Sequence, residues 1–120
     1  NLKILWRNMS KQNLANNKIC FIYCPFPNEH VAKKIAKELI EKKLVFCANI
    51  LDKNNSIYLN DVGELTENTE NIVIFKTLEE NSNNLFETLE EKHPYQVPAI
   101  IKLDAVVNSA FIHAIREKIS

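Results

Sequence analysis

The chain has 120 residues, of which 46% are hydrophobic, and this length and composition predict one globular domain with its own core. Its 15 basic and 15 acidic side chains balance, which gives no electrostatic reason to expect nucleic acid or an anionic membrane as a partner. No apolar run approaches the roughly 20 residues that a membrane span needs. Three cysteines, an odd number, argue against a disulfide framework and favour a reducing, cytoplasmic location.

The first seventeen residues differ from the rest of the chain, because they hold three basic side chains and no acidic one. We expect residues 1–17 to be a disordered tail, partly left over from cloning, with Met9 as a candidate natural start. A basic segment without acids is also typical of an organelle transit peptide, so an organelle is the alternative location. The domain itself is expected over residues 18–120.

The first expected elements are a strand, a helix and a second strand. Residues 18–24 are a continuous apolar run, which predicts a strand buried on both faces that ends at the prolines of the segment PFPN. Asn28 fits a helix N-cap, and apolar side chains then recur at helical spacing through residues 31–40. A second apolar strand is expected over residues 44–51.

A hairpin is predicted in the middle of the chain. The polar segment 52–56 is typical of a turn, and residues 57–59 resume extended structure. Gly63, the only glycine, suits a bend that needs a positive φ angle. Residues 71–77 are the expected return strand.

The C-terminal third predicts a helix, a strand and an extra helix. An apolar stripe over residues 78–89 has helical spacing and ends before Pro94, which a helix does not accommodate. Residues 97–107 predict a further strand. Asn108 is the expected cap of a last helix that ends near residue 119.

This order of elements predicts an α+β, ferredoxin-like sandwich. Its antiparallel sheet would carry both main helices on one face, with an extended hairpin between the second and third strands and an extra C-terminal helix. The strands are apolar on both sides, and the remaining helices are too few to cover the second face. We therefore expect the chain to oligomerise, with the hairpin offering strand edges for pairing between subunits.

Several separate motifs resemble the CutA family of divalent-cation tolerance proteins. They are the run CPFPNEHVAKKIAKELIEKKLVFCANIL, the segment SIY with the following glycine, the strand IVIFKT and the connector HPYQVPAII. Together they cover about residues 18–119 in the family's order. The resemblance implies a ferredoxin-like protomer in a tight homotrimer with hairpins packed between subunits. It also implies a link to copper and other divalent metal ions, and no enzymatic reaction.

The resemblance further implies a copper site at two matching positions. Cys24, at the end of the first strand, and His93 of the HPY segment take the family's ligand positions, while Lys92 stands where some members have a second histidine. One thiolate and one imidazole suit Cu(I) or Zn(II), but two ligands make a weak site unless a further group completes it. Nearby candidates without a diagnostic spacing are Glu29, His30 and Glu90.

Structural roles are the alternative for each of these side chains. Cys24 also suits a small buried residue at a strand end, and His93 also suits a ring hydrogen-bonded to backbone in a stiff connector. For Cys20 and Cys47 packing is the favoured role. Tyr95 is expected to anchor a core or an interface, with its hydroxyl group satisfied.

Two other classes of function stay open beside metal tolerance. A ferredoxin-like trimer with clefts between subunits is similar in architecture to small-molecule sensors, so sensing or signal transduction with incidental metal binding is the alternative. A Cys–His enzyme would need a third orienting group, and the chain has neither a glycine-rich phosphate loop nor a nucleophile elbow. The expected function is a non-enzymatic trimer that binds copper or other divalent metal ions weakly and takes part in the response to metal ions.

Overall fold

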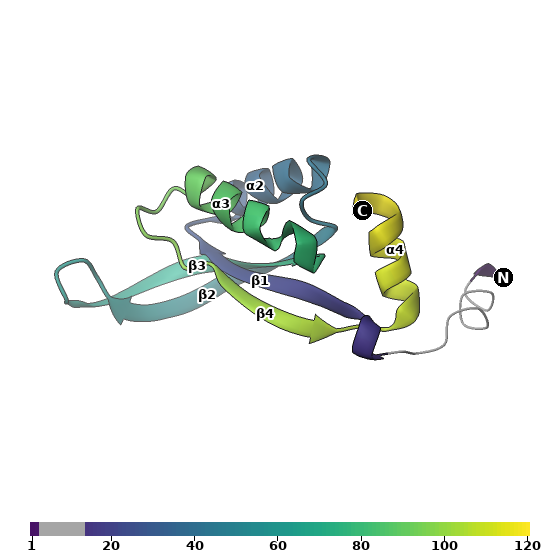
Figure 1. The fold of residues 1–120 in the computed structure, drawn as a ribbon. Coiled ribbons are helices and arrows are strands. Elements are labelled where there is room, and N and C mark those ends of the chain that lie inside the picture. The colour runs from purple at the N-terminus through teal and green to yellow at the C-terminus, as the bar shows by residue number, and fades with distance from the viewer. Residues whose placement is uncertain (3–13) are drawn as a thin grey trace.

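The structure is a computed structural model, and it describes residues 1–2 and 14–120. Two short 3-10 turns, four strands and three helices follow one another in this part of the chain (Figure 1). They are η1 (Leu14–Asn16), β1 (Lys18–Phe26), α2 (Glu29–Glu41), β2 (Cys47–Leu59), β3 (Leu65–Thr77), η2 (Glu79–Asn81), α3 (Ser82–Lys92), β4 (Ile101–Val106) and α4 (Ser109–Ile119).

The four strands form one antiparallel sheet in the order β2-β3-β1-β4. Helices α2 and α3 lie on one face of this sheet, and α4 lies at the end where β1 begins (Figure 1). The hairpin of β2 and β3 extends well beyond the helical layer at the opposite end. The predicted α+β, ferredoxin-like arrangement with an extended hairpin and an extra C-terminal helix is confirmed.

The main core fills the space between the sheet and the two helices α2 and α3. Even-numbered residues of β1, from Cys20 to Phe26, are fully buried there, because alternate residues of a strand share one face. They belong to one cluster with Val73 and Phe75 of the neighbouring strand β3 and with Leu39 of α2. This packing fixes the two ends of β1, where the candidate ligands lie.

Helix α2 begins where the sequence predicts. The Asn28 side-chain oxygen accepts a hydrogen bond of 2.9 Å from the Val31 N–H, which satisfies one of the open donors of the first turn. Glu29 lies in that turn, where the helix dipole favours a carboxylate. The buried stripe of the helix consists of Ala32, Ile35, Ala36 and Leu39.

The second face of the sheet is covered only in part. Ile112 and Ile115 of α4 pack against Ile19 and Leu78 in a small second core. The strand register places Ile101 and Leu103 of β4 on the same face as Ile19, but these two side chains are about half exposed, at 47% and 54%. In the described part of the chain, the helices therefore leave an apolar area of this face open, as the sequence predicted.

The hairpin is longer than expected, because residues 52–56 lie inside β2 and do not form a turn. A register shift between Leu51 and Asn54 marks a bulge in the pairing with β3, where Lys53 has a φ angle of 51°. A bulge accommodates an extra residue without ending the strand, so polar residues that usually end strands continue it here. The prediction of a turn at 52–56 is wrong.

The hairpin bends at Gly63, whose φ angle of 79° confirms the predicted role of the only glycine. The Asn60 side-chain oxygen accepts hydrogen bonds from the N–H groups of Val62 and Glu64, at 3.1 and 2.9 Å. β3 then begins at Leu65 and not at residue 71, because backbone pairing with β2 holds its polar half extended.

Other strand ends also differ from the expectation. β1 continues through Pro25 to Phe26, β2 begins at Cys47, and β4 begins at Ile101 rather than at residue 97. No helix in the described residues is long and apolar enough to cross a membrane.

The predicted N-terminal tail falls largely on residues 3–13, which lie outside the described residues. Next to them, Asn17 is buried, and its side-chain amide donates a hydrogen bond of 2.9 Å to the Ser109 hydroxyl oxygen. The backbone carbonyl oxygen of Asn17 accepts a hydrogen bond of 2.9 Å from the Val107 N–H. Asn17 therefore contacts the start of α4, and the boundary at residue 18 stays a prediction.

Candidate functional site

The predicted ligands Cys24 and His93 meet at the end of β1, beside Pro25. Cys24 is fully buried, and its Sγ atom lies 3.9 Å from the Pro25 carbonyl oxygen. His93 follows α3, is 7% exposed, and places its Nε2 atom 2.7 Å from the same oxygen. The fold therefore brings the two side chains to one backbone carbonyl group.

Both ring nitrogens of His93 have backbone partners. Nε2 approaches the Pro25 carbonyl oxygen, which only accepts, and Nδ1 is 3.1 Å from the Tyr95 N–H, which only donates. This pattern requires the neutral ring with its proton on Nε2. Burial lowers the pKa of His93, which agrees with a neutral ring.

The same ring is packed between aromatic neighbours. It stacks on Phe26 with ring centroids 4.6 Å apart and 17° between the planes, and it lies 4.8 Å from the Tyr95 ring. A metal ion on Nε2 would have to replace the ring proton and its bond to Pro25. The proton would then move to Nδ1, which would face the Tyr95 N–H as a second donor.

The Cys24 thiol is protonated at neutral pH in this corner. Burial raises its pKa to about 12, and the nearby Glu70 carboxylate adds to the effect. Metal ions bind the thiolate, so binding here would have to overcome this shift. Lys92 forms an ion pair with Glu38 at 3.0 Å across α3 and α2. The Cys24–His93 metal site stays a prediction.

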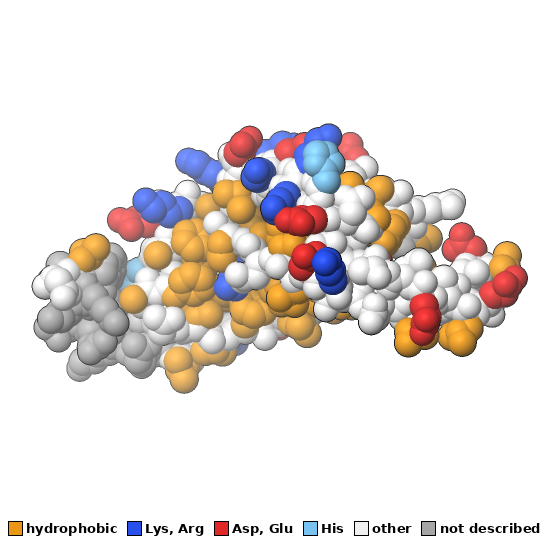
Figure 2. Space-filling view, turned by 180° about the vertical axis from the view of Figure 1, so that it is seen from behind, with side chains coloured by type: hydrophobic (Ala, Val, Ile, Leu, Met, Phe, Trp, Pro, Cys, Tyr) orange, Lys and Arg blue, Asp and Glu red, His pale blue; other side chains and the backbone are white. Residues whose placement is uncertain are grey.

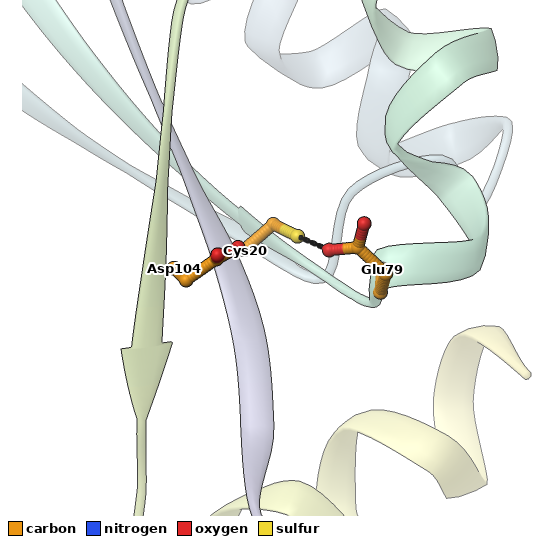
Figure 3. A group of neighbouring side chains, drawn as sticks. All are labelled: Cys20, Glu79 and Asp104. Carbon is orange, nitrogen blue, oxygen red and sulfur yellow. Dashed lines mark hydrogen bonds between the residues drawn. The ribbon is translucent and has the colours of Figure 1, made fainter.

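A second group of metal-ligating side chains lies at the opposite end of β1 (Figure 3). It consists of Cys20 on β1, Glu79 on η2 and Asp104 on β4, whose ligand atoms all lie within 4.8 Å of one another. Within residues 1–2 and 14–120, no other group of three such atoms gathers this closely. We call it the Cys20 group.

Strand register and one turn assemble the Cys20 group. Cys20 and Asp104 are direct partners in the pairing of β1 with β4, so their side chains leave the sheet on the same face. Thr77, the partner of Cys20 on the other side, ends β3, and the chain then turns so that Glu79 comes over the thiol. No short sequence spacing signals this group, since its members come from three separate elements.

The Cys20 group combines a buried thiol with exposed acids. The Sγ atom of Cys20 donates a hydrogen bond of 2.7 Å to Glu79 Oε2, shown as the dashed line in Figure 3. Burial, followed by this hydrogen bond, raises the pKa of Cys20 to about 12. The Lys102 ammonium pairs with Glu79 and lies 3.9 Å from Asp104.

This donor set fits a borderline divalent metal ion. Zn(II) accepts thiolate and carboxylate ligands, whereas Mg(II) and Ca(II) prefer oxygen alone. Binding would replace the thiol proton and displace the Lys102 ammonium from the two carboxylates. Three protein ligands would leave room for water or another ligand on the metal ion.

The sequence assigned packing roles to the other two cysteines. Cys20 belongs to the core, as expected, but also contacts Glu79, which the sequence analysis missed. Cys47 is partly buried on β2, and burial raises its pKa. All three cysteines are free thiols in the structure.

Comparisons of the sequence and of the fold with known proteins point to the same group of proteins. A model of the CutA1 divalent ion tolerance protein family matches residues 20–118. The divalent-cation tolerance protein CutA of Thermotoga maritima is 35% identical over 99 residues, which cover 82% of this chain and 96% of that protein. Both descriptions name tolerance to divalent ions, in agreement with the function that the motifs implied.

Solved structures give the same result. The crystal structure of CutA1 from Ehrlichia chaffeensis has a TM-score of 0.81 and 31% identity, covering 92% of this chain and 99% of that one. The structure of the periplasmic divalent cation tolerance protein CutA from Archaeoglobus fulgidus has a TM-score of 0.80 and 30% identity, with 85% and 99% covered. The resemblance predicted from the motifs is confirmed, and the chain belongs to the CutA1 divalent ion tolerance protein family.

Proposed function

We propose that this protein contributes to divalent-metal tolerance as a non-enzymatic homotrimer that binds copper or another divalent metal ion weakly. The observation that carries metal binding is the Cys20 group, in which one thiol and two carboxylates gather within 4.8 Å. The family's description, tolerance to divalent ions, supports the same function.

The Cys20 group explains why binding would be weak and dependent on conditions. A metal ion must remove the Cys20 proton, which a raised pKa retains, and must compete with the Lys102 ammonium. Such a centre fills when metal is abundant and empties when it is scarce. This behaviour suits a tolerance protein better than a permanent structural metal ion would.

The Cys24–His93 pair is the second candidate centre, and copper is its proposed metal. Its support is the approach of both side chains to the Pro25 carbonyl oxygen, together with the soft thiolate and imidazole donors that Cu(I) favours. Binding there has a larger structural cost than at the Cys20 group, since the two backbone hydrogen bonds of His93 would have to break.

Zinc and copper uptake by matched variants tests these centres. We expect equilibrium dialysis with elemental analysis to find Zn(II) on the wild type and on Cys47→Ser, and little on Cys20→Ser. The double variant Cys24→Ser/His93→Gln should retain zinc and show whether copper needs the second centre. Wild-type zinc uptake by Cys20→Ser would contradict the Cys20 group, and wild-type copper uptake by the double variant would contradict the second centre.

The homotrimer is supported by apolar surface that one copy leaves open. Hydrophobic side chains gather below the charged helical layer and again at the far end of the hairpin (Figure 2). The largest exposures near the hairpin and the connector belong to Ile57, Leu59, Val62, Leu65 and Val97. Patches of this kind on soluble proteins usually mark contact surfaces.

Light scattering during size exclusion tests the assembly. The proposal predicts three times the chain mass of 13.9 kDa at micromolar concentration. Leu103→Lys would place a charge on the open sheet face and should lower the mass, whereas Lys37→Gln on α2 should not. A stable wild-type species at the mass of one chain would contradict the trimer.

We also propose a cytoplasmic location, with an organelle as the alternative. The three free cysteines support a reducing compartment. The relative from Archaeoglobus fulgidus is described as periplasmic, so relatives alone do not decide. Immunoblotting of cell fractions tests the location, and recovery outside the cytoplasmic fraction would contradict it.

A further inference from the structure

A pocket distinct from the Cys20 group opens where the hairpin meets the connector after α3. Its volume is about 480 Å³. Tyr58 of β2, Glu70 of β3, Tyr95 of the connector and Asp61 near the hairpin bend contribute to its walls. Its polar groups are thus two carboxylates and two phenols, together with smaller neutral groups.

Glu70 is the unusual member of this pocket. It is only 8% exposed, and its Oε2 atom accepts a hydrogen bond of 2.6 Å from the Tyr95 hydroxyl. It forms no ion pair with any described residue, and no lysine, arginine or histidine lines the pocket. Burying a carboxylate without a cation is costly, so the pocket has a site for a positive charge that the described chain does not supply.

The Glu70 carboxylate is held in position by the connector. Tyr95, its hydrogen-bond donor, is tied through its own N–H to His93 Nδ1. Burial, with the Glu70 hydrogen bond, raises the pKa of Tyr95, so the phenol stays a donor. A ligand would therefore meet a carboxylate that is already oriented.

The walls suit an organic cation better than a bare metal ion. Aromatic rings attract ammonium groups, and Pro25 and Val97 add apolar surface beside Tyr58 and Tyr95. A volume of about 480 Å³ lies in the range of small-molecule pockets and far exceeds what one ion fills. Among the described residues, Glu70 belongs to no group of three or more metal-ligating side chains.

We propose that this pocket binds a small organic ammonium ion with an apolar body. Glu70 is its counter-ion, Asp61 adds negative charge, and the rings of Tyr58 and Tyr95 contact the hydrocarbon part. This gives the protein an amine-sensing function beyond metal tolerance. It does not depend on the Cys20 group, so either proposal can fail alone.

Phenethylamine and its neutral analogue 2-phenylethanol are the matched probes. Isothermal titration of the full-length wild-type chain at pH 7 should show saturable binding of the amine. The alcohol should bind at least about tenfold more weakly, since it lacks the charge that Glu70 recognises. Cys20→Ser should bind the amine as the wild type does.

Three variants identify the groups that recognise the amine. Glu70→Gln keeps an acceptor for Tyr95 but removes the charge, and should weaken amine binding about tenfold or more. Glu67→Gln removes an exposed charge from the same strand and should leave binding unchanged. Tyr58→Leu should weaken binding about threefold, and it tests the pocket even if Glu70→Gln does not fold.

Failure of the wild type to saturate with the amine would overturn the proposal. That outcome includes the case in which a side chain of a second copy fills the pocket in the assembly. Equal affinity for amine and alcohol would also overturn it, as would unchanged amine binding in a folded Glu70→Gln variant.

Discussion

The two ends of β1 each carry a buried cysteine on the same face of the sheet, yet their surroundings are opposite. At the Cys24 end, the chain's own backbone occupies both nitrogens of His93. At the Cys20 end, the partners are exposed carboxylates, Glu79 and Asp104. Burial raises the pKa of both thiols to about 12, so thiol acidity does not distinguish them.

The difference lies in what satisfies the neighbouring ligand atoms. At the Cys24 end those atoms hold the connector to the end of β1, and releasing them would loosen the fold. At the Cys20 end the competing partner is a side-chain ammonium group, that of Lys102, which a metal ion would displace without breaking a backbone hydrogen bond. The Cys24 end is held closed by these backbone contacts, and the Cys20 end is the one we propose to bind metal.

The largest expected effect is the loss of His93. His93→Ala would remove a buried ring stacked on Phe26 and leave the Pro25 carbonyl and the Tyr95 N–H without their partners. We expect the free energy of unfolding to fall by about 3 kcal/mol in urea titrations at fixed protein concentration.

The matched control is His30→Ala on the exposed side of α2, which should change the free energy of unfolding by less than about 0.5 kcal/mol. Equal, small effects of both substitutions would contradict the structural role of His93. The backbone contacts of His93 would then not be what holds the connector to the end of β1.

The next largest effect concerns pH and Cys24. Its folded-state pKa is raised from the ordinary 9.0 to about 12, so the protonated thiol contributes stability that is complete below pH 9 and lost as pH rises toward 12. At pH 10.5 the loss should be about 2 kcal/mol. Urea unfolding at pH 8 and 10.5 should show this much less pH dependence in Cys24→Ala than in the wild type. Identical pH dependence of the two proteins would contradict the raised pKa of the buried Cys24 thiol.

The smallest effect concerns Lys102, which pairs with Glu79 of the Cys20 group. Lys102→Gln removes the ammonium that competes with a metal ion for Glu79 and Asp104, and should tighten Zn(II) binding by roughly fivefold. Titration calorimetry measures this change, with Lys37→Gln on α2 as a control for overall charge. Weaker binding in Lys102→Gln would show that the ammonium does not compete.

Much of the fold could be predicted from local patterns. The apolar run before Pro25, the cap at Asn28 and the glycine at position 63 each have one dominant local cause, and the structure bears them out. The turn expected at 52–56 failed because cross-strand backbone bonds, with a bulge, hold even polar residues extended.

The two candidate sites differ in the same respect, because one was predicted from the sequence and the other was not. The Cys24–His93 corner was predicted from the resemblance to the CutA family, because Cys24 and His93 stand at the family's ligand positions. The Cys20 group depends on register and on a turn, which place Asp104 and Glu79 beside a thiol that local reasoning assigned to packing. No spacing in a single sequence reports such long-range pairing.

Cobalt spectroscopy tests most directly whether metal binds at the Cys20 end of β1. Co(II) bound to a thiolate gives a charge-transfer band in the near ultraviolet, so each cysteine can be examined by its own serine variant. We expect the band in the wild type and in Cys24→Ser, and its absence in Cys20→Ser. A band that survives in Cys20→Ser and disappears in Cys24→Ser would contradict metal binding by the Cys20 group.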